Sequence, residues 1–457
     1  YDWSETGSTY IVNKTIYVEK GETLTIGPNV TVLFERNCTI AVNGTLEVKG
    51  DEAHPVIFDT YNWDPQDPGE EDSYWGIVMG VGSDGTIDRA IFRNATKAIE
   101  VYDAEVTITN SEFYSVYRLA PIYADFHEGG SIYVEACYIE ARSSVWDEGA
   151  ITITASALAY GDDISETEVM ITIVDNEITS TSEHYAIYIA QGSFAEDDAV
   201  SALSGTITIV GNTIHENAKG SDTIHINRMA MAIDNGSSSM NVGVMITDNV
   251  VRSNTQRSLI HIEENVLANN SSVVAMNGDI VILANTLEAI LDEGDAAAKP
   301  PKGLELNTSV EVNDHGEAKI REAAFFEHVT IVDNTFSMCG SAIEHNVRLH
   351  AAGHGKILCM DGALIIYGNI IDGANDAFVI SQDLAARDSA SLYANLPVMI
   401  AHNEVKSDIS ACKMQVDLLA ADDSVLEREG EFRMEHNSCG MEDGMTVEYA
   451  LDVRAEG

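Results

Sequence analysis

Basic residues are scarce in this chain of 457 residues: 25 lysines and arginines stand against 74 aspartates and glutamates, which gives a formal net charge of -49. So acidic a chain is unsuited to binding nucleic acid or an anionic membrane through bulk electrostatics. Its surface attracts cations instead. We interpret most of the acidity as a source of solubility in a salty or cation-rich medium rather than as a specific binding site.

Long hydrophobic runs are absent as well. No stretch reaches the roughly 18 apolar residues that a membrane-spanning helix requires, so we expect no membrane insertion. Proline is rare, with 8 residues, whereas hydrophobic residues make up 45% of the chain, a balance that excludes a collagen-like or disordered polymer and permits a large core. The chain starts at Tyr1 rather than Met, without a basic-then-apolar leader. We therefore expect a secreted protein whose signal has been removed.

A local pattern recurs along the chain: two apolar residues at alternate positions, a small polar anchor, and a further apolar residue two positions after the anchor. Ile171, Ile173, Asn176 and Ile178 form one copy. The alternation predicts a strand with one buried face. Asparagine tolerates the left-handed backbone region, so the anchor predicts a sharp corner. The asparagine anchors are Asn176, Asn212, Asn249, Asn285, Asn334, Asn369, Asn403 and Asn437, and two earlier copies carry Ser111 and Cys137 instead.

The spacing of the anchors predicts stacked coils. From Cys137 onward successive anchors lie 34 to 39 residues apart, with one gap of 49 between Asn285 and Asn334. Such periods are typical of units that bury their hydrophobic face only against a neighbour. When coils stack, the asparagines fall above one another, so we expect a ladder of amide hydrogen bonds that fixes the register.

The sequence therefore predicts an all-β parallel solenoid with long loop insertions, built as one domain over residues 1–457. Closely spaced strand-like runs predict narrow N-terminal coils over 1–60, and the anchors predict long coils over 61–457. We expect a loop insertion over 286–328, because the polar run DEGDAAAKPPKG (292–303) interrupts the repeat. Within it, residues 316–328 are expected to form a short helix.

Four phrases in the first quarter of the chain carry a family resemblance: TLTIGPNVTVLF (23–34), NGTLEVKG (43–50), PVIF (55–58) and YWGIVM (74–79). Their order resembles the right-handed β-helix repeats of secreted bacterial and archaeal surface proteins. The resemblance implies a single right-handed parallel β-helix. Together with the acidity and the absence of a recognisable active site, the chain resembles archaeal cell-envelope proteins such as sheath or surface-layer subunits.

This resemblance implies a structural subunit of an extracellular assembly that self-associates, with no catalytic residues. The alternatives are a carbohydrate-binding adhesin and, less favoured, a polysaccharide lyase or glycoside hydrolase. Gly161-Asp162-Asp163 and Gly353-His354-Gly355 resemble fragments of polygalacturonases, but about five coils separate them here, and we interpret them as coincidence. At three to seven residues after the anchor, acids at matched positions of consecutive coils are limited to one pair, Asp408 and Glu442, which we interpret as part of a solvated turn.

One acidic stretch is a candidate for calcium. The run WDPQDPGEED supplies hard oxygen ligands of the kind that Ca²⁺ takes, although the spacing is not that of an EF-hand and a solvated loop is the alternative. The acids are Asp64, Asp67, Glu70, Glu71 and Asp72. We expect no other cofactor, and we expect divalent cations or glycans as additional partners beside a second copy of the chain.

Cysteines and glycosylation motifs complete the candidates. Cys38, Cys339, Cys359 and Cys412 are candidates for disulfides, either as cross-links between subunits or as local intrachain bridges. Cys137 and Cys439 occupy anchor and apolar positions and are expected as buried thiols. Nine N-x-S/T motifs fit export, with turn chemistry as the alternative: Asn13, Asn29, Asn37, Asn43, Asn94, Asn235, Asn269, Asn270 and Asn307.

Overall fold

The computed structural model describes residues 1–61, 74–143, 149–181, 185–217, 220–290, 300–320, 328–359, 363–406, 411–439 and 446–456. Within these ranges every regular element is a β-strand, which confirms the predicted fold class. They contain no helix that is long and apolar enough to cross a membrane. The chain divides into two compact units: unit 1 comprises residues 1–155, 168–189 and 208–224, and unit 2 comprises 156–167, 190–207 and 225–457.

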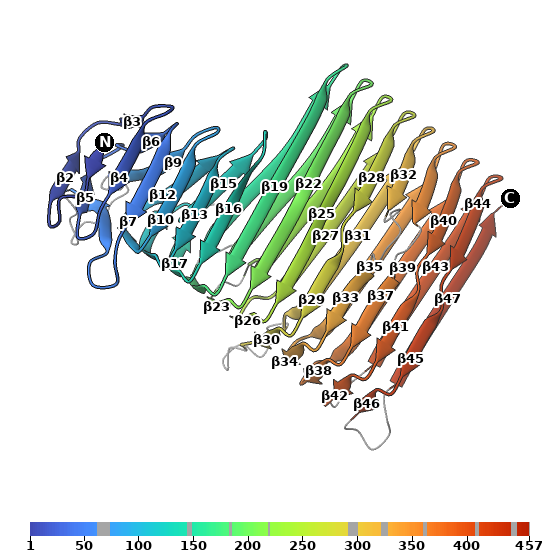
Figure 1. Ribbon diagram of the computed structural model, residues 1–457. Helices are drawn as coiled ribbons and strands as arrows, with labels where there is room; N and C mark the ends of the chain where they lie inside the picture. Colours follow the sequence, from blue (N-terminus) through green and yellow to red (C-terminus); the bar gives the residue numbers. More distant parts are fainter. Residues whose placement is uncertain are drawn as a thin grey trace. The chain divides into compact units, whose positions relative to one another are not determined.

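Each unit is a parallel β-solenoid whose coils visit three sheets, A, B and C, in that order. Each strand pairs in parallel with the equivalent strand of the neighbouring coil, and Figure 1 shows this stacking within unit 2 for β29, β33, β37 and β41. Parallel pairing places equivalent residues of successive coils above one another, so a side chain on one strand forms a column with its equivalents.

In unit 1, sheet A contains β1 (Asp2–Trp3), β4 (Thr23–Ile26), β7 (Thr45–Lys49), β10 (Asp84–Asp88), β13 (Glu105–Thr109) and β16 (Gly130–Glu135). Sheet B contains β2 (Thr9–Val12), β5 (Thr31–Phe34), β8 (Val56–Thr60), β11 (Ala90–Arg93), β14 (Glu112–Arg118), β17 (Tyr138–Ser143), β20 (Glu177–Ser180) and β23 (Thr213–Glu216). Sheet C contains β3 (Ile16–Val18), β6 (Ile40–Val42), β9 (Tyr74–Met79), β12 (Ala95–Tyr102) and β15 (Ile122–Phe126).

In unit 2, sheet A contains β25 (Ser237–Thr247), β28 (Val273–Asn277), β29 (Ile280–Leu283), β32 (Glu317–Ile320), β33 (His328–Val332), β36 (Lys356–Cys359), β37 (Ala363–Tyr367), β40 (Ser391–Asn395), β41 (Val398–Ala401), β44 (Val425–Glu429) and β45 (Phe432–Glu435). Sheet B contains β26 (Val250–Ser253), β30 (Thr286–Ala289), β34 (Thr335–Ser337), β38 (Ile370–Asp372), β42 (Glu404–Val405) and β46 (Ser438–Cys439). Sheet C contains β27 (Ser258–Ala268), β31 (Lys302–Val312), β35 (Ser341–Ala351), β39 (Asp376–Ala386), β43 (Ala411–Ala421) and β47 (Thr446–Glu456). Five strands have residues in both units: β18 (Ile151–Tyr160), β19 (Ile164–Val174), β21 (Ile187–Glu196), β22 (Val200–Val210) and β24 (Ile224–Ile233).

Stacked side chains fill the core of unit 1. Phe34, Phe58, Phe92 and Phe113 are each 0% exposed and point inward from successive strands of sheet B. Their ring centroids lie 6.4, 4.6 and 5.0 Å apart in turn. This column follows directly from alternate apolar residues in parallel register, because every second side chain of a strand faces inward.

The asparagine anchors do form an amide ladder within each unit. In unit 1, Asn176 Nδ2 donates to Asn212 Oδ1 at 2.9 Å. In unit 2 the same bond runs at 2.9 to 3.0 Å from Asn249 to Asn285, Asn285 to Asn334, Asn334 to Asn369, Asn369 to Asn403, and Asn403 to Asn437. In each of these pairs the acceptor Oδ1 also accepts the backbone N–H of the donor asparagine. Each of these amide oxygens therefore satisfies a buried backbone N–H at the corner of the preceding coil.

The left-handed residue of each corner is not the anchor but the residue before it. The backbone angle φ is 53° at Asp175, 54° at Asp333 and 57° at His402. The expectation that the asparagine itself adopts this conformation was therefore wrong. At Gly368, with φ of 68°, a Cβ would lie 2.2 Å from Asp333 Oδ1, so a larger residue there would require the Asp333 side chain to move.

A buried ion pair interrupts the apolar core of unit 2. Arg228, on β24, is 0% exposed, and its Nη1 donates to Glu264 Oε1 on β27 at 2.8 Å. Its Nη2 donates to Val242 O at 2.6 Å and to Asn277 O at 2.8 Å. Thr308 Oγ1 donates to Glu264 Oε2 at 2.8 Å. The guanidinium thus supplies donors for carbonyls of sheet A near the break between β28 and β29.

Residues 286–328 are not a loop insertion. They include β30, β31 and β32, and β31 pairs with β27 along ten residues between Ser258 and Ala268. Residues 317–320 form a strand, so the predicted helix over 316–328 was also wrong. The chain between Asn285 and Asn334 holds the strands β30, β31, β32 and β33, which make up a complete coil. Residues 291–299 and 321–327 of this segment lie outside the described residues.

Candidate functional site

The outer face of sheet A in unit 2 is apolar. Strands β29, β33, β37 and β41 pair in register with one another and with the end of β25, so their outward side chains form two columns. These columns contain Met245, Val281, Thr330, Ile365 and Met399, and Thr247, Leu283, Val332, Tyr367 and Ala401. We call these ten residues the apolar face. None of them is charged, and Met245 and Tyr367 are 41% and 40% exposed.

The sequence of these strands explains the apolar face. They read VMIT, IVIL, VTIV, LIIY and VMIA, which are nearly continuous apolar runs instead of alternating ones. Such runs are typical of parallel strands covered on both sides. Inward residues such as Ile246, Ile282 and Ile366 are 0% exposed, whereas eight of the ten outward residues are exposed or half-exposed and only Thr247 and Ala401 are buried.

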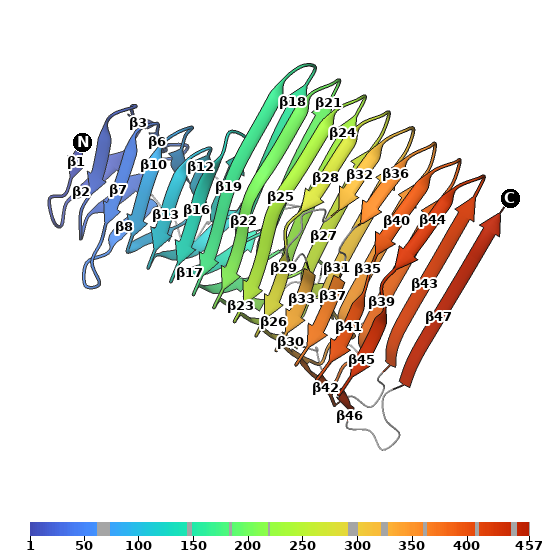
Figure 2. The same ribbon diagram turned by 45° about the vertical axis from the view of Figure 1, so that its right-hand side comes forward.

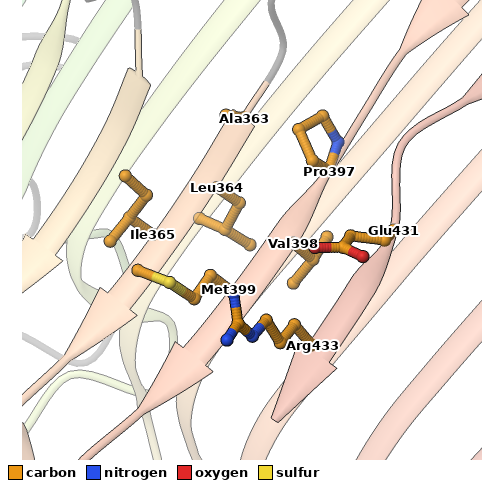
Figure 3. Close-up of a pocket in the computed structure, with 8 residues that line it drawn as sticks. All are labelled: Ala363, Leu364, Ile365, Pro397, Val398, Met399, Glu431 and Arg433. Atoms are coloured by element: carbon orange, nitrogen blue, oxygen red, sulfur yellow. The ribbon is translucent and has the colours of Figure 1, made fainter. Parts of the chain in front are cut away.

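A groove of about 190 Å³ crosses one end of the apolar face. Figure 3 shows Ile365, Met399 and Arg433 projecting from β37, β41 and β45, with Glu431 at the start of β45. The remaining lining residues are Ala363, Leu364, Pro397 and Val398. Arg433 pairs with Glu435 on its own strand. An apolar floor with charges only at its rim suits the docking of an apolar side chain.

The groove begins between β40 and β41, where the strands of sheet A are interrupted. Pro397 precedes β41 and has no N–H to donate to a neighbouring strand. Gly430, in the next coil, has φ of 103°, and a Cβ there would lie 2.5 Å from Pro397 N. Only glycine allows this close approach to Pro397, which lines the groove.

The outer face of sheet C in unit 2 is polar by contrast. Asn307 Nδ2 lies 2.9 Å from His261 Nε2, and Asn346 Nδ2 donates to Asn307 Oδ1 at 2.9 Å. Lys302 Nζ lies 2.7 Å from Glu305 Oε1 and 2.8 Å from Glu344 Oε1. Side chains on neighbouring strands therefore pair across the coils.

Burial and hydrogen bonding act in opposite directions on this cluster. Burial by itself lowers the pKa of Lys302, but the hydrogen bonds with Glu305 and Glu344 outweigh it, and the pKa is raised above its ordinary value. Burial by itself raises the pKa of Glu305, but the hydrogen bonds from Lys302 and Ser258 hold it below its ordinary value. The hydrogen bonds thus favour the charged forms of Lys302 and Glu305, and the ion pair between Lys302 and Glu344 links β31 to β35.

A column of aspartates on sheet C was missed by the sequence reasoning. Asp383, Asp417 and Asp452 occupy equivalent positions of β39, β43 and β47. They follow their anchors by 14 or 15 residues, whereas the comparison of acids extended only seven residues beyond the anchor. Gln415 Nε2 donates to Asp417 Oδ2 at 2.7 Å, and His350 Nε2 lies 3.0 Å from Asp383 Oδ2. Asp383 and Asp417 thus each have a polar partner on the outer face of sheet C.

The cysteines predicted to form disulfides are buried thiols. Cys38, Cys339, Cys359 and Cys412 are 7%, 1%, 1% and 0% exposed and none forms a disulfide within the chain, so the expected intrachain bridges are absent among them, whereas cross-links between copies stay a prediction. Burial raises the pKa of the Cys339 and Cys412 thiols to about 12. Cys137 is also a buried thiol, as expected. Cys339 follows its anchor by five residues and Cys412 by nine, distances that suggest loops, but both side chains are buried. The Cys439 side chain lies outside the described residues.

The remaining predicted sites are not brought together. All nine asparagines of the N-x-S/T motifs are exposed or half-exposed, and φ is positive at Asn29, Asn37, Asn94, Asn235 and Asn270, which fits turn chemistry. Glycosylation of these residues stays a prediction. The candidate calcium residues Asp64 to Asp72 lie outside the described residues, as do Asp408 and Glu442.

Comparison with known families supports the fold. A family model for the right-handed β-helix region matches residues 75–237. No curated protein matches the chain. The chain is therefore a right-handed parallel β-helix in fold, and its activity has to be argued from its own surfaces.

Proposed function

We propose that the protein is a structural, non-enzymatic subunit of an extracellular cell-envelope assembly, such as a sheath, surface layer or filament, that forms by association of copies of this chain. The observation that carries the proposal is the apolar face. A parallel sheet with an uncovered apolar side is a contact surface, because isolated apolar residues are common on protein surfaces but contiguous patches are not.

The charge of the chain favours a second copy as the occupant of this face. Two copies with a net charge of -49 each repel one another over most of their surface. The apolar face carries no charge, so contact there brings the fewest carboxylates together. At its edge the groove presents Arg433 beside Glu431, which gives a second copy one charge of each sign to meet.

The size of the face indicates a weak contact that is repeated. Five strands about 4.8 Å apart, each with two outward residues, cover an area on the order of 250 Å². A stable pairwise interface buries about 800 Å² per partner. A single contact of this size is therefore transient, whereas many copies held in one layer gain stability through multivalency.

Sedimentation velocity of the 457-residue chain over a range of protein concentrations tests the proposal. We expect reversible association, and we expect Met399→Glu to weaken it at least tenfold, because it places a carboxylate on an otherwise uncharged contact surface, at its groove end. Ser381→Glu is the matched control: Ser381 faces outward on β39 of sheet C, and its replacement adds the same charge outside the apolar face.

Both variants should retain the thermal unfolding midpoint of the wild-type chain to within a few degrees, since both residues are half-exposed. A wild-type chain that stays monomeric at every concentration overturns the proposal. If both variants weaken self-association equally, general charge repulsion explains the effect, and the apolar face is not the contact surface.

A further inference from the structure

Two histidines lie side by side on the outer face of sheet C in unit 2. His225 is on β24 and His261 is on β27, and their ring centroids are 4.8 Å apart with the ring planes at 90°. His225 is 8% exposed, and His261 is half-exposed. Figure 2 shows β31 and β35 after β27, and these two strands are joined by the ion pair of Lys302 with Glu344. The histidines therefore belong to a face whose side chains interact from one coil to the next.

The two rings bring one nitrogen atom each close together. These two nitrogens lie within 4.8 Å of one another. When two nitrogens bind the same Zn²⁺ at about 2.0 to 2.1 Å in tetrahedral geometry, they are about 3.3 Å apart. The gap to be closed is therefore at most about 1.5 Å, which small rotations of the two side chains cover.

The amides beside His261 hold its ring in one orientation. Asn307 Nδ2 lies 2.9 Å from His261 Nε2, and Asn346 Nδ2 donates to Asn307 Oδ1 at 2.9 Å. A histidine that binds a metal ion through one ring nitrogen usually makes a hydrogen bond through the other, and this bond orients the ring. The row of amides supplies such a support from the next coil.

A buried amide oxygen lies on the same strand as His225. Asn227 follows His225 by two residues, so both side chains leave β24 on the same side. Its Oδ1 is buried and has no hydrogen-bond partner among the described residues. Buried polar atoms without a partner are rare in native proteins. Water bound to an ion at the two histidines would donate a hydrogen bond to this oxygen.

The ligand atoms select the class of ion. Imidazole nitrogen suits Zn²⁺, Cu²⁺ and Ni²⁺, whereas Ca²⁺ and Mg²⁺ take oxygen ligands. The net charge of -49 attracts cations of every kind to the surface. A pair of imidazoles adds a preference for transition metals that carboxylates alone do not have.

Burial distinguishes this pair from two other histidine pairs of unit 2. The ring centroids of His315 and His354 lie 4.9 Å apart, and those of His402 and His436 lie 5.0 Å apart. All four of these residues are exposed and have positive φ, so they lie at corners between strands. His225 is buried within a long strand instead. Less side-chain freedom is therefore lost when an ion binds there.

We propose that His225 and His261 bind one divalent transition-metal ion, of the class that Zn²⁺ represents, and that water fills its remaining coordination positions. The bound ion is a structural cross-link between β24 and β27, two neighbouring strands of sheet C. This inference does not depend on self-association, because both histidines belong to the same copy of the chain.

Isothermal titration calorimetry of the 457-residue chain with Zn²⁺ tests the site. The chain is first stripped with a chelator and is then titrated in excess Ca²⁺, which occupies surface carboxylates and competes poorly for imidazole. We expect one tightly bound Zn²⁺ per chain. His225→Gln and His261→Gln should each weaken binding about tenfold or more. The double variant should weaken it little further, because a single histidine no longer chelates the ion.

The matched control is His402→Gln, which removes one ring of an exposed pair and should leave the tight binding unchanged. Thermal unfolding separates loss of the site from loss of the fold. Zn²⁺ should raise the unfolding midpoint of the wild-type chain and of His402→Gln, because an ion that binds only the folded state stabilises it. It should not raise the midpoint of His261→Gln. Without metal, His261→Gln should unfold within a few degrees of the wild type, since His261 is half-exposed.

X-ray absorption spectroscopy of the wild-type chain with one equivalent of Zn²⁺ needs no variant. We expect imidazole nitrogens among the atoms that coordinate the ion. Coordination by oxygen alone overturns the proposal. It is also overturned if both histidine variants keep the wild-type affinity for Zn²⁺, or if excess Ca²⁺ abolishes Zn²⁺ binding.

Discussion

Asn369→Ala removes one rung of the amide ladder and should affect the two neighbouring corners unequally. In the native chain Asn334 N and Asn334 Nδ2 donate to Asn369 Oδ1 at 2.9 and 3.0 Å. The backbone N–H of residue 369 donates in turn to Asn403 Oδ1 at 2.9 Å, which the substitution leaves in place. The Asn334 corner therefore loses its acceptor, whereas the corner at 369 keeps its own.

The expected cost follows from the burial of the orphaned donor. Asn334 is 0% exposed, so its N–H cannot turn to solvent. A buried donor without a partner costs about 1 to 3 kcal/mol. If local opening controls exchange, this cost makes the Asn334 amide exchange about 5 to 150 times faster, at about 1.4 kcal/mol per tenfold.

Hydrogen exchange read by mass spectrometry with single-residue fragmentation measures this directly. We expect faster exchange at residue 334 and exchange within about twofold of wild type at residue 369. Asn375→Ala, at an exposed asparagine nearby, should change neither. Equal loss of protection at 334 and 369, or none at 334, would refute the directional ladder.

Three further predictions concern the core and the charge. Glu264→Gln should lower the free energy of unfolding, measured by urea denaturation, by about 3 to 5 kcal/mol, because Arg228 stays buried without a full counter-charge. The control Glu288→Gln, which breaks the exposed ion pair with Arg252, should lower it by less than about 1 kcal/mol. Alkylation at about pH 8 should label neither Cys339 nor Cys412 until the chain unfolds. Since their folded pKa of about 12 exceeds the ordinary 9.0, the stability that these thiols contribute is complete below pH 9.0 and should be lost as the pH rises toward about 12. Self-association should strengthen between about 0.02 M and about 0.5 M NaCl, because salt screens the repulsion between acidic copies; weaker association at high salt would contradict an apolar contact.

The regular part of the fold was predictable because a short local sequence pattern specifies it. Alternate aliphatic residues and an asparagine at a fixed distance specify a strand, a corner and a column at once. The position of the left-handed residue was harder to infer. This position has no constant residue type, because it is occupied by Asp175, Gly211, Ala284 and His402 in different coils. The left-handed conformation was therefore assigned to the constant asparagine that follows it.

The features that depend on what lies opposite a residue were not predictable from one sequence. Arg228 and Glu264 occupy inward positions that the alternation assigns to apolar residues, and their partners lie on other coils. Cys339 and Cys412 follow the anchor at distances that suggest loops, yet both face the core. The apolar face is a similar case, since VMIA and LIIY do not reveal whether one side or both sides are covered.

Cryo-electron microscopy of the associated 457-residue chain tests the central claim, that copies of this solenoid assemble with one another, most directly. We expect particles in which copies of the chain contact one another through Met399 and its neighbours on the apolar face. Single chains in every particle, with the apolar face open to solvent at concentrations where sedimentation shows no association, would contradict the account.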